Sequence, residues 1–329
     1  MDMATKDIKW IWIGFSILVS LSFLLGPAFA QEIAYTYKII DQPGAAQDLN
    51  VHGDVVLTNY PYPGGTILTK KNRRMNATHF QCWDTIFDAT QIKKIDNQGN
   101  VVGNCQIDGT QHGRQVGFIR DKRGVVAFLD VPGADITEGY AVSDERACGQ
   151  FYTPSIPNAS GFARVHGFCK STNGAYQTLD VPMPFTVTVI TGLNSRKKVG
   201  NFFVYDSVTN ETSQWGAFIE DNGTFTALSV PGATFTYVLD INGHDDVLLD
   251  SSKGNYILSD GIYFKIGNPP ADPGFTVTDL QVNGFNDELE LAGTYLQRQT
   301  GCGGEFIINC PMIFRSFVAT PALPQVAAR

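Results

Sequence analysis

Features that would indicate a familiar activity are missing from this sequence of 329 residues. After residue 30 it contains no Gly-x-Ser-x-Gly, no His-Glu-x-x-His and no glycine-rich phosphate loop, so the usual motif-borne enzymes are not supported. It also lacks Cys-x-x-Cys, and its 5 histidines are scattered. Because zinc sites need clustered ligands, we expect no bound metal and no cofactor.

Charge is scarce as well. Charged residues make up 17% of the chain, and the net charge is -8 with a pI near 5.1. This balance repels phosphate backbones and anionic lipid, so nucleic acid and membrane surfaces are poor partners. The 33 glycines and 12% aromatic residues are typical of many short strands joined by tight turns, rather than of long solvated helices.

Only the first thirty residues contain a long apolar run. A short charged start, the run from Trp10 to Leu25 and small residues up to Ala30 are typical of a signal peptide over residues 1–30, cleaved to leave Gln31 first. The alternative, an uncleaved membrane anchor, needs about 20 apolar residues, which is longer than this run. We therefore expect a secreted or periplasmic protein without membrane insertion after removal of the signal.

All six cysteines follow residue 30. An even number in an exported chain favours disulfides, although the connectivity stays open. The most economical pairs are Cys302 with Cys310, Cys148 with Cys169, and Cys82 with Cys105.

An internal repeat is the strongest pattern in the sequence. Segments beginning at Val116, His166 and Trp215 share a glycine followed closely by phenylalanine, a polar turn, and a Leu-Asp-Val-Pro or Leu-Ser-Val-Pro centre. Each copy predicts four short strands, with turns such as Asn222-Gly223 closing a hairpin and proline ending the second strand. Weaker copies extend the series at a period of roughly 50 residues. The equivalent first-strand positions are Ile67, Phe118, Phe168, Phe218, Tyr256 and Phe317.

The two ends of the chain complement each other. The segment from Tyr35 to Ile40 begins in the middle of a unit, and the segment 315–320 is a first strand without the rest of its unit. If these strands pair, the array closes without free edges, whereas an open solenoid would need capping units. We therefore predict an all-β fold: a six-bladed β-propeller of four-stranded repeats over residues 31–320, closed by its terminal strands and followed by a tail at 321–329. Its units start near residues 35, 65, 116, 166, 215 and 254.

These repeats resemble a known family. The Gly-Phe start, the Leu-Asp-Val-Pro-Gly-Ala centre at Leu129 to Ala134 and the Asn-x-x-Gly-x-Val-Val turn at Asn50 to Val56 are similar to the bacterial extracellular HAF repeats. The resemblance extends from about Tyr35 to Thr320, and is weakest in the second unit, which carries an insertion around Asn72 to Phe80. It implies an exported, propeller-like protein and supplies no catalytic residues.

Three groups of residues are candidates for a site. The oxygens of Asp240 to Asp246 resemble part of a calcium loop, but their spacing and the missing terminal glutamate favour a structural polar turn, in which Asn242 corresponds to Asn50 and Asp96. The segment Asn286 to Glu288 is interpreted in the same way. The other two groups are the recurring aspartates Asp41, Asp130 and Asp180, which as turn formers need have no function, and the aromatics Tyr60, Tyr62, Trp83 and Trp215, which could stack on sugars or fill blade interfaces.

Repeats without a catalytic motif favour a binding or interaction module, which we expect to be monomeric, for an extracellular glycan, polymer or protein. One alternative is a channel-centred enzyme of the lyase, lactonase or glycosidase type. It would require carboxylates to meet histidines such as His52, His112 or His166 at one channel mouth. The other alternative is a structural surface protein, with neither a pocket nor an aromatic patch.

Overall fold

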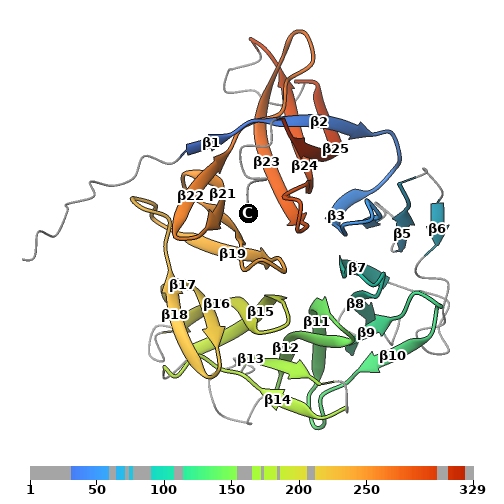
Figure 1. Ribbon diagram of the computed structural model, residues 1–329, viewed down its shortest axis with the longest axis vertical. Coiled ribbons are helices and arrows are strands. Elements are labelled where there is room, and N and C mark those ends of the chain that lie inside the picture. Colours follow the sequence, from blue (N-terminus) through green and yellow to red (C-terminus); the bar gives the residue numbers. More distant parts are fainter. Residues whose placement is uncertain are drawn as a thin grey trace, which may run out of the picture.

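The computed structural model describes residues 31–58, 64–70, 74–76, 90–106, 114–153, 165–171, 174–183, 186–205, 212–301 and 310–322. Within these ranges the regular elements are strands, which form six sheets arranged as blades around a common axis (Figure 1). The predicted six-bladed propeller is confirmed. The expected signal peptide at 1–30 and most of the expected tail lie outside the described residues.

The first three blades follow the chain, and each is a four-stranded antiparallel sheet. From the axis outward, blade 1 contains β3 (Ala45–Leu49), β4 (Val55–Thr58), β5 (Gly65–Leu68) and β6 (Arg74–Asn76). Blade 2 contains β7 (Thr90–Ile95), β8 (Val101–Gln106), β9 (Gln115–Arg120) and β10 (Val126–Leu129). Blade 3 contains β11 (Ile136–Ser143), β12 (Arg146–Tyr152), β13 (Val165–Lys170) and β14 (Tyr176–Thr178).

The other three blades include the two N-terminal strands. Blade 4 contains β15 (Thr186–Leu193), β16 (Lys197–Tyr205), β17 (Thr212–Asp221) and β18 (Thr224–Leu228). Blade 5 contains β19 (Thr236–Ile241), β20 (Val247–Ser251), β21 (Gly254–Ser259) and β22 (Ile262–Ile266), and β1 (Gln31–Ile33) adds a fifth, parallel strand. Blade 6 contains β23 (Phe275–Phe285), β24 (Leu291–Gln299), β25 (Met312–Pro321) and β2 (Tyr35–Ile40).

The terminal strands close the ring as the sequence predicts. Strand β2 pairs antiparallel with β25, with Tyr35 opposite Pro321 and Ile40 opposite Ser316 (Figure 1). Blade 6 therefore takes three strands from the end of the described chain and one from its beginning. This pairing covers part of the edge of β25 and removes the need for a capping unit.

The sequence repeat and the blade are offset by two strands. The strand that carries Phe118, which opens a repeat, is the third strand of blade 2 rather than the first of a new blade. The first half of each repeat thus forms the outer half of one blade, and its second half forms the inner half of the next. Each repeat therefore links two blades covalently.

The glycines of the repeat make room for its phenylalanines. On the second strands of blades 2, 4 and 6, a glycine lies directly opposite a fully buried phenylalanine of the third strand. A Cβ added at each of these glycines would lie 2.0–2.2 Å from a carbonyl oxygen of the inner strand and 2.8 Å from the opposite ring, so only glycine fits there. The pairs are Gly103 with Phe118, Gly200 with Phe218, and Gly293 with Phe317.

A ring of hydrogen bonds connects all six inner turns, which join the first strand of each blade to its second. In blades 1, 2, 4, 5 and 6, an Asn or Asp side chain first accepts hydrogen bonds from two backbone N–H groups of its own turn. Side chains then donate to the next turn round the ring. The donors and acceptors are Asn50 to Asp96 O, Gln98 to Asp144 Oδ1, Arg146 to Asn194 O, Asn194 to Asn242 O, Asn242 to Asn286 O, and Asn286 to Asn50 O, at 2.7–3.4 Å.

Candidate functional site

The candidate calcium loop has the structural role favoured by the sequence. The Oδ1 atom of Asn242 accepts hydrogen bonds from the backbone N–H groups of His244 and Asp246, so its oxygen is already engaged within the turn. Asn50 and Asp96 make the equivalent bonds in blades 1 and 2, as the alignment of the repeats predicts. The described residues contain no group of three or more histidine, cysteine or acidic side chains placed to hold a metal ion.

The recurring aspartates lie away from the axis. Asp130 follows the outermost strand of blade 2, where Arg114 donates to both carboxylate oxygens at 2.6 and 2.7 Å. Asp180 follows the outermost strand of blade 3 and contacts His166 Nδ1 at 2.7 Å. Asp41 follows β2, which is the outermost strand of blade 6. The three carboxylates therefore do not meet in one site.

The histidines do not converge on one channel mouth in the described part of the chain. His166 stacks on Phe151 in the outer half of blade 3, with ring centroids 5.2 Å apart. His52 and His244 lie in the inner turns of blades 1 and 5. His112 is outside the described residues. The histidine–carboxylate constellation that would favour the enzyme alternative is thus not formed by His52 or His166.

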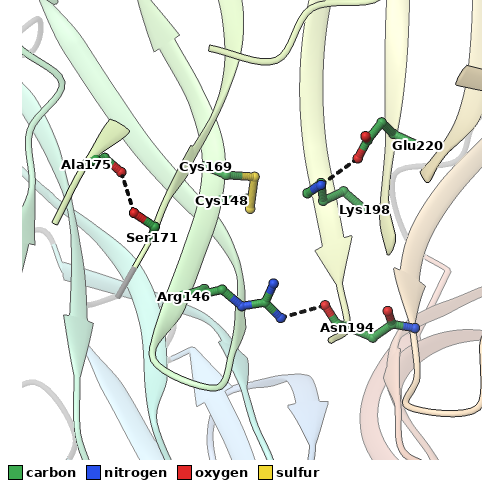
Figure 2. The surroundings of a disulfide bond; sticks show 8 residues. All are labelled: Arg146, Cys148, Cys169, Ser171, Ala175, Asn194, Lys198 and Glu220. Carbon is green, nitrogen blue, oxygen red and sulfur yellow. Dashed lines mark hydrogen bonds and ion pairs between the residues drawn. A yellow bond between two sulfur atoms is a disulfide. The ribbon is translucent and has the colours of Figure 1, made fainter. Parts of the chain in front are cut away.

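Within the described residues, one disulfide has both of its cysteines, and it joins two neighbouring strands. Cys148 on β12 and Cys169 on β13 face each other in register, with Cα atoms 4.1 Å apart, and they form the bond drawn in Figure 2. This predicted pair is confirmed. Cys105 is also disulfide-bonded, but Cys82, its expected partner, lies outside the described residues. Such bonds fit an oxidising, extracytoplasmic compartment, and the described residues include no helix of the length and hydropathy needed to span a bilayer.

The predicted bridge to Cys310 is not formed. Cys310 has a free thiol in this structure, and Cys302 lies outside the described residues. Closeness in sequence lowers the entropy cost of closing a loop, but it does not determine where the two thiols point. The expected Cys302–Cys310 pair was therefore wrong.

Every inner strand carries the same irregularity. The pairing between the first and second strands of each blade shifts by one residue at an equivalent place, which is the mark of a β-bulge. After the bulge, three blades place a charged side chain toward the axis and three place a small residue. These residues are Asp48, Lys94 and Asp240 on blades 1, 2 and 5, and Ala141, Gly192 and Gly284 on blades 3, 4 and 6.

The three charged residues form a bridge across the axis, which we call the Lys94 strut. Lys94 Nζ extends from blade 2 to Asp240 Oδ2 on the opposite blade 5, at 2.6 Å, and also donates to the carbonyl oxygen of Asn283 at 2.8 Å. Asp48 Oδ1 is 3.9 Å from the same amine. The small residues leave the necessary space, since a Cβ at Gly284 would lie 2.0 Å from Asp48 Oδ1.

The strut contains one carboxylate more than it has cations. Burial would lower the pKa of Lys94, but Asp240 and Asp48 outweigh that effect and raise it. Burial raises the pKa of Asp48 to about 8; the Lys94 ammonium opposes this shift and the Asp240 carboxylate adds to it. We therefore assign the ion pair to Lys94 and Asp240, and place a proton on Asp48 at neutral pH.

The strut separates two cavities along the axis. A cavity of about 190 Å³ lies at the inner-turn end. It is lined by the residues that directly follow the six axial positions Asp48, Lys94, Ala141, Gly192, Asp240 and Gly284. Residues that precede them line a second cavity of about 340 Å³ at the other end, which we call the open mouth. Since all six inner strands run the same way along the axis, the two cavities lie on opposite sides of the strut. The bulge residues Gln47, Lys93, Tyr140, Thr191, Leu239 and Asn283 line the open mouth.

Four aromatic rings lead from blade 4 to the open mouth, and we call them the aromatic shelf. Trp215 is 50% exposed and packs edge-on against Phe203, with centroids 4.4 Å apart, and against Tyr237 at 5.9 Å. Phe235, 40% exposed, lies 5.3 Å from Tyr237. Tyr237 also lines the open mouth, so the shelf and the cavity are continuous. Of the four aromatics considered from the sequence, only Trp215 falls in the described ranges.

Charged groups lie on opposite sides of the open mouth. Lys93, on blade 2, has its amine 6.0 Å from the centre of the Tyr140 ring, and burial lowers its pKa although Glu138 opposes the shift. Asp250, on blade 5, is the cross-strand neighbour of Tyr237. Burial raises the pKa of Asp250, with a smaller contribution from Asp279. A hydrogen-bonding ligand could therefore find a cation on one side and an acceptor on the other.

Sequence reasoning overlooked the strut and the open mouth. Asp48 and Lys94 were not singled out, and Asp240 was considered only as part of a calcium loop. A usable signal was present, because each strut residue stands two positions before the Asn or Asp of an inner turn and is directly followed by an apolar residue. Aligning the repeats on that turn would have shown that three of the equivalent positions are charged and three are small.

Comparison with known proteins bears on the fold alone. No protein-family model and no curated protein matches the sequence. Similar solved structures include virginiamycin B lyase from Staphylococcus aureus, with 10% identity and a TM-score of 0.46 over 88% of this chain and 99% of that one. A luciferin-regenerating enzyme shares 9% identity, with a TM-score of 0.42 over 88% of this chain and 96% of that one. The assignment to the propeller fold rests on the strand order given above.

Proposed function

We propose that this protein is an exported binding module that holds a glycan at the open mouth and the aromatic shelf. The observation that carries the proposal is the continuity of four aromatic rings, two of them well exposed, with a cavity whose lining includes Lys93 and Asp250. Aromatic faces suit the apolar faces of sugar rings, and Lys93 and Asp250 offer an amine and a carboxylate to sugar hydroxyls.

The rigidity of the ring supports a recognition role. The hydrogen-bonded inner turns and the Lys94 strut hold all six blades in fixed relation, so that the open mouth is formed before a ligand arrives. A site formed in advance spends less of its binding free energy on ordering. Export to the periplasm or the cell exterior is part of the proposal, and is supported by the disulfide and the leader-like start of the sequence.

A glycan microarray probed with purified residues 31–329, followed by titration calorimetry with the best ligand, tests this function. We expect Trp215→Ala to weaken binding by about tenfold or more, because exposed aromatic anchors dominate such sites. Phe314→Ala is the matched control, since Phe314 is 57% exposed but lies on β25 and not on the shelf. The proposal would be refuted if the protein bound no glycan on the array, or if Trp215→Ala and Phe314→Ala weakened glycan binding equally.

A second candidate, catalysis on the bound glycan, is favoured by one observation. Lys93 has a lowered pKa and Asp250 a raised one, and shifts toward neutrality are typical of acid–base pairs in active sites. Prolonged incubation with a ligand from the array, with chromatography to detect new chain ends, tests it. If the protein is a catalyst, we expect product from the wild type and no product from Lys93→Met, although Lys93→Met still binds the ligand.

A further inference from the structure

The open mouth is a blind cavity. The Lys94 strut joins blade 2 to blade 5 across the axis, and Asn283 on blade 6 binds the same amine. The side chains of Lys94 and Asp48 are 10% and 4% exposed, so the barrier is packed rather than open to solvent. A polymer cannot thread through such a channel. A chain that occupies the cavity must place one of its ends there.

The shelf and the floor of this cavity lie at different depths. Phe235 directly precedes β19 and Tyr237 lies near its start, so both come before the bulge residue Leu239 and the shelf is at the rim. Lys93 is itself a bulge residue and precedes the strut residue Lys94 directly, so it belongs to the floor. A ligand segment on the shelf can run along the surface, whereas only a terminal residue reaches Lys93.

The floor has a cation that the described residues leave without an ion pair. Lys94 is neutralised by Asp240, and the Glu138 carboxylate accepts hydrogen bonds from Tyr140 and Gln150. The Lys93 amine has the face of Tyr140 beside it and no carboxylate within ion-pair distance in the described part of the chain. An anionic group on the ligand would supply the missing partner, and charge-assisted bonds in a half-buried site are the strong ones.

We propose that the open mouth recognises the acidic end of a glycan, a terminal sugar that carries a carboxylate, such as a hexuronic acid. The inference rests on the proposed function and adds the chemistry of the terminal sugar. The carboxylate binds Lys93, hydroxyls on the opposite edge bind Asp250, and the apolar ring face lies on Tyr237. The net charge of -8 disfavours polyanions, but this ligand end brings a single carboxylate next to Lys93, and charges beyond about 8 Å are screened at physiological ionic strength.

Two tetrasaccharides that differ only at the terminal ring provide the test. One carries glucuronic acid at its non-reducing end, and the other is its carboxyl-reduced, neutral analogue. We expect the acidic ligand to bind about tenfold more tightly, with the difference abolished in Lys93→Met and restored in Lys93→Arg. Trp215→Ala should weaken both ligands equally.

The outcomes separate this inference from the proposed function. Equal affinity of the two ligands, or an acid preference that survives in Lys93→Met, overturns the acidic chain end while a Trp215-dependent glycan site stands. A polysaccharide that binds as tightly after both of its ends are blocked also overturns it. If neither tetrasaccharide nor any arrayed glycan binds, both proposals fall. Thermal unfolding of each variant shows that a lost preference does not come from a lost fold.

Discussion

The ring of Tyr37 packs edge to face against the ring of Phe317, with centroids 5.1 Å apart, although these residues lie near opposite ends of the described chain. Phe317 is fully buried, in a core cluster shared by blades 5 and 6. The packing of one terminal strand on the other therefore stabilises the closed ring as well as blade 6.

Replacement of this ring tests the closure. We expect Phe317→Ala to lower the free energy of unfolding by about 3–5 kcal/mol, because a fully buried aromatic leaves a large cavity. Urea denaturation followed by tryptophan fluorescence measures the loss. Phe314→Ala, on the same strand but exposed, should change it little. Equal effects of the two variants would contradict a closure that depends on the Phe317 core.

The strut predicts a dependence of stability on pH. Burial raises the pKa of Asp48 from 3.8 to about 8, so between about pH 4 and pH 8 the folded protein holds a proton that the unfolded chain has lost. The free energy of unfolding contributed by this group therefore falls as the pH rises through that window. In Asp48→Asn we expect this part of the decline to vanish, so that the variant gains stability relative to the wild type at pH 9 but not at pH 4. Urea titrations at pH 4, 6 and 9 measure it, and parallel curves for the two proteins would contradict the assignment.

The inner turns predict a second effect on stability. Asn286 accepts from two backbone N–H groups of its turn and donates to Asn50 O on the neighbouring blade. We expect Asn286→Ala to cost about 2–3 kcal/mol, because buried polar groups on both blades lose their partners. Asp121→Ala is the control, since Asp121 makes the same two bonds within an outer turn but links no blades. A loss as small as that of the control would show that the ring adds nothing beyond turn formation.

The disulfide predicts a third effect. Cys148 and Cys169 are 21 residues apart, and a bond that closes a loop of this size stabilises by about 3 kcal/mol through the unfolded chain. We expect the Cys148→Ala/Cys169→Ala double variant to lose about this amount in thermal denaturation. Cys310→Ala removes a free thiol and should leave the midpoint unchanged. If a reducing agent destabilises the wild type and the double variant equally, a disulfide other than Cys148–Cys169 makes the larger contribution to stability.

Much of the fold could be predicted from the sequence, because its repeat marks both strands and turns. The Asn222-Gly223 dipeptide forms the expected tight turn, with positive φ angles of 50° and 85°. The offset between repeat and blade could not be read in this way, because the pattern shows which strands follow one another but not which four consecutive strands share a sheet. Assignment to the HAF family stays a prediction.

The site was harder to predict than the fold. Lys94 and Asp240 lie in different repeats, and only the closed ring brings Lys94 Nζ to 2.6 Å from Asp240 Oδ2 on the opposite blade. The shelf likewise depends on the contact of Trp215 on blade 4 with Tyr237 on blade 5. Local patterns cannot encode such distances. They encode turns well, which is why the structural role of Asn242 was predicted correctly and the importance of Asp240 was overlooked.

The offset between repeat and blade also bears on how such a ring changes size. A duplicated repeat would supply the outer two strands of one sheet and the inner two strands of the next. The ring would therefore gain one complete blade, and no existing pair of strands would have to separate. The charged strut would not tolerate the change as easily, since Lys94 and Asp240 are three blades apart and face each other across the axis only in a ring of six blades. The sheets could therefore accommodate a duplicated repeat, whereas the ion pair on the axis fits only the present number of blades.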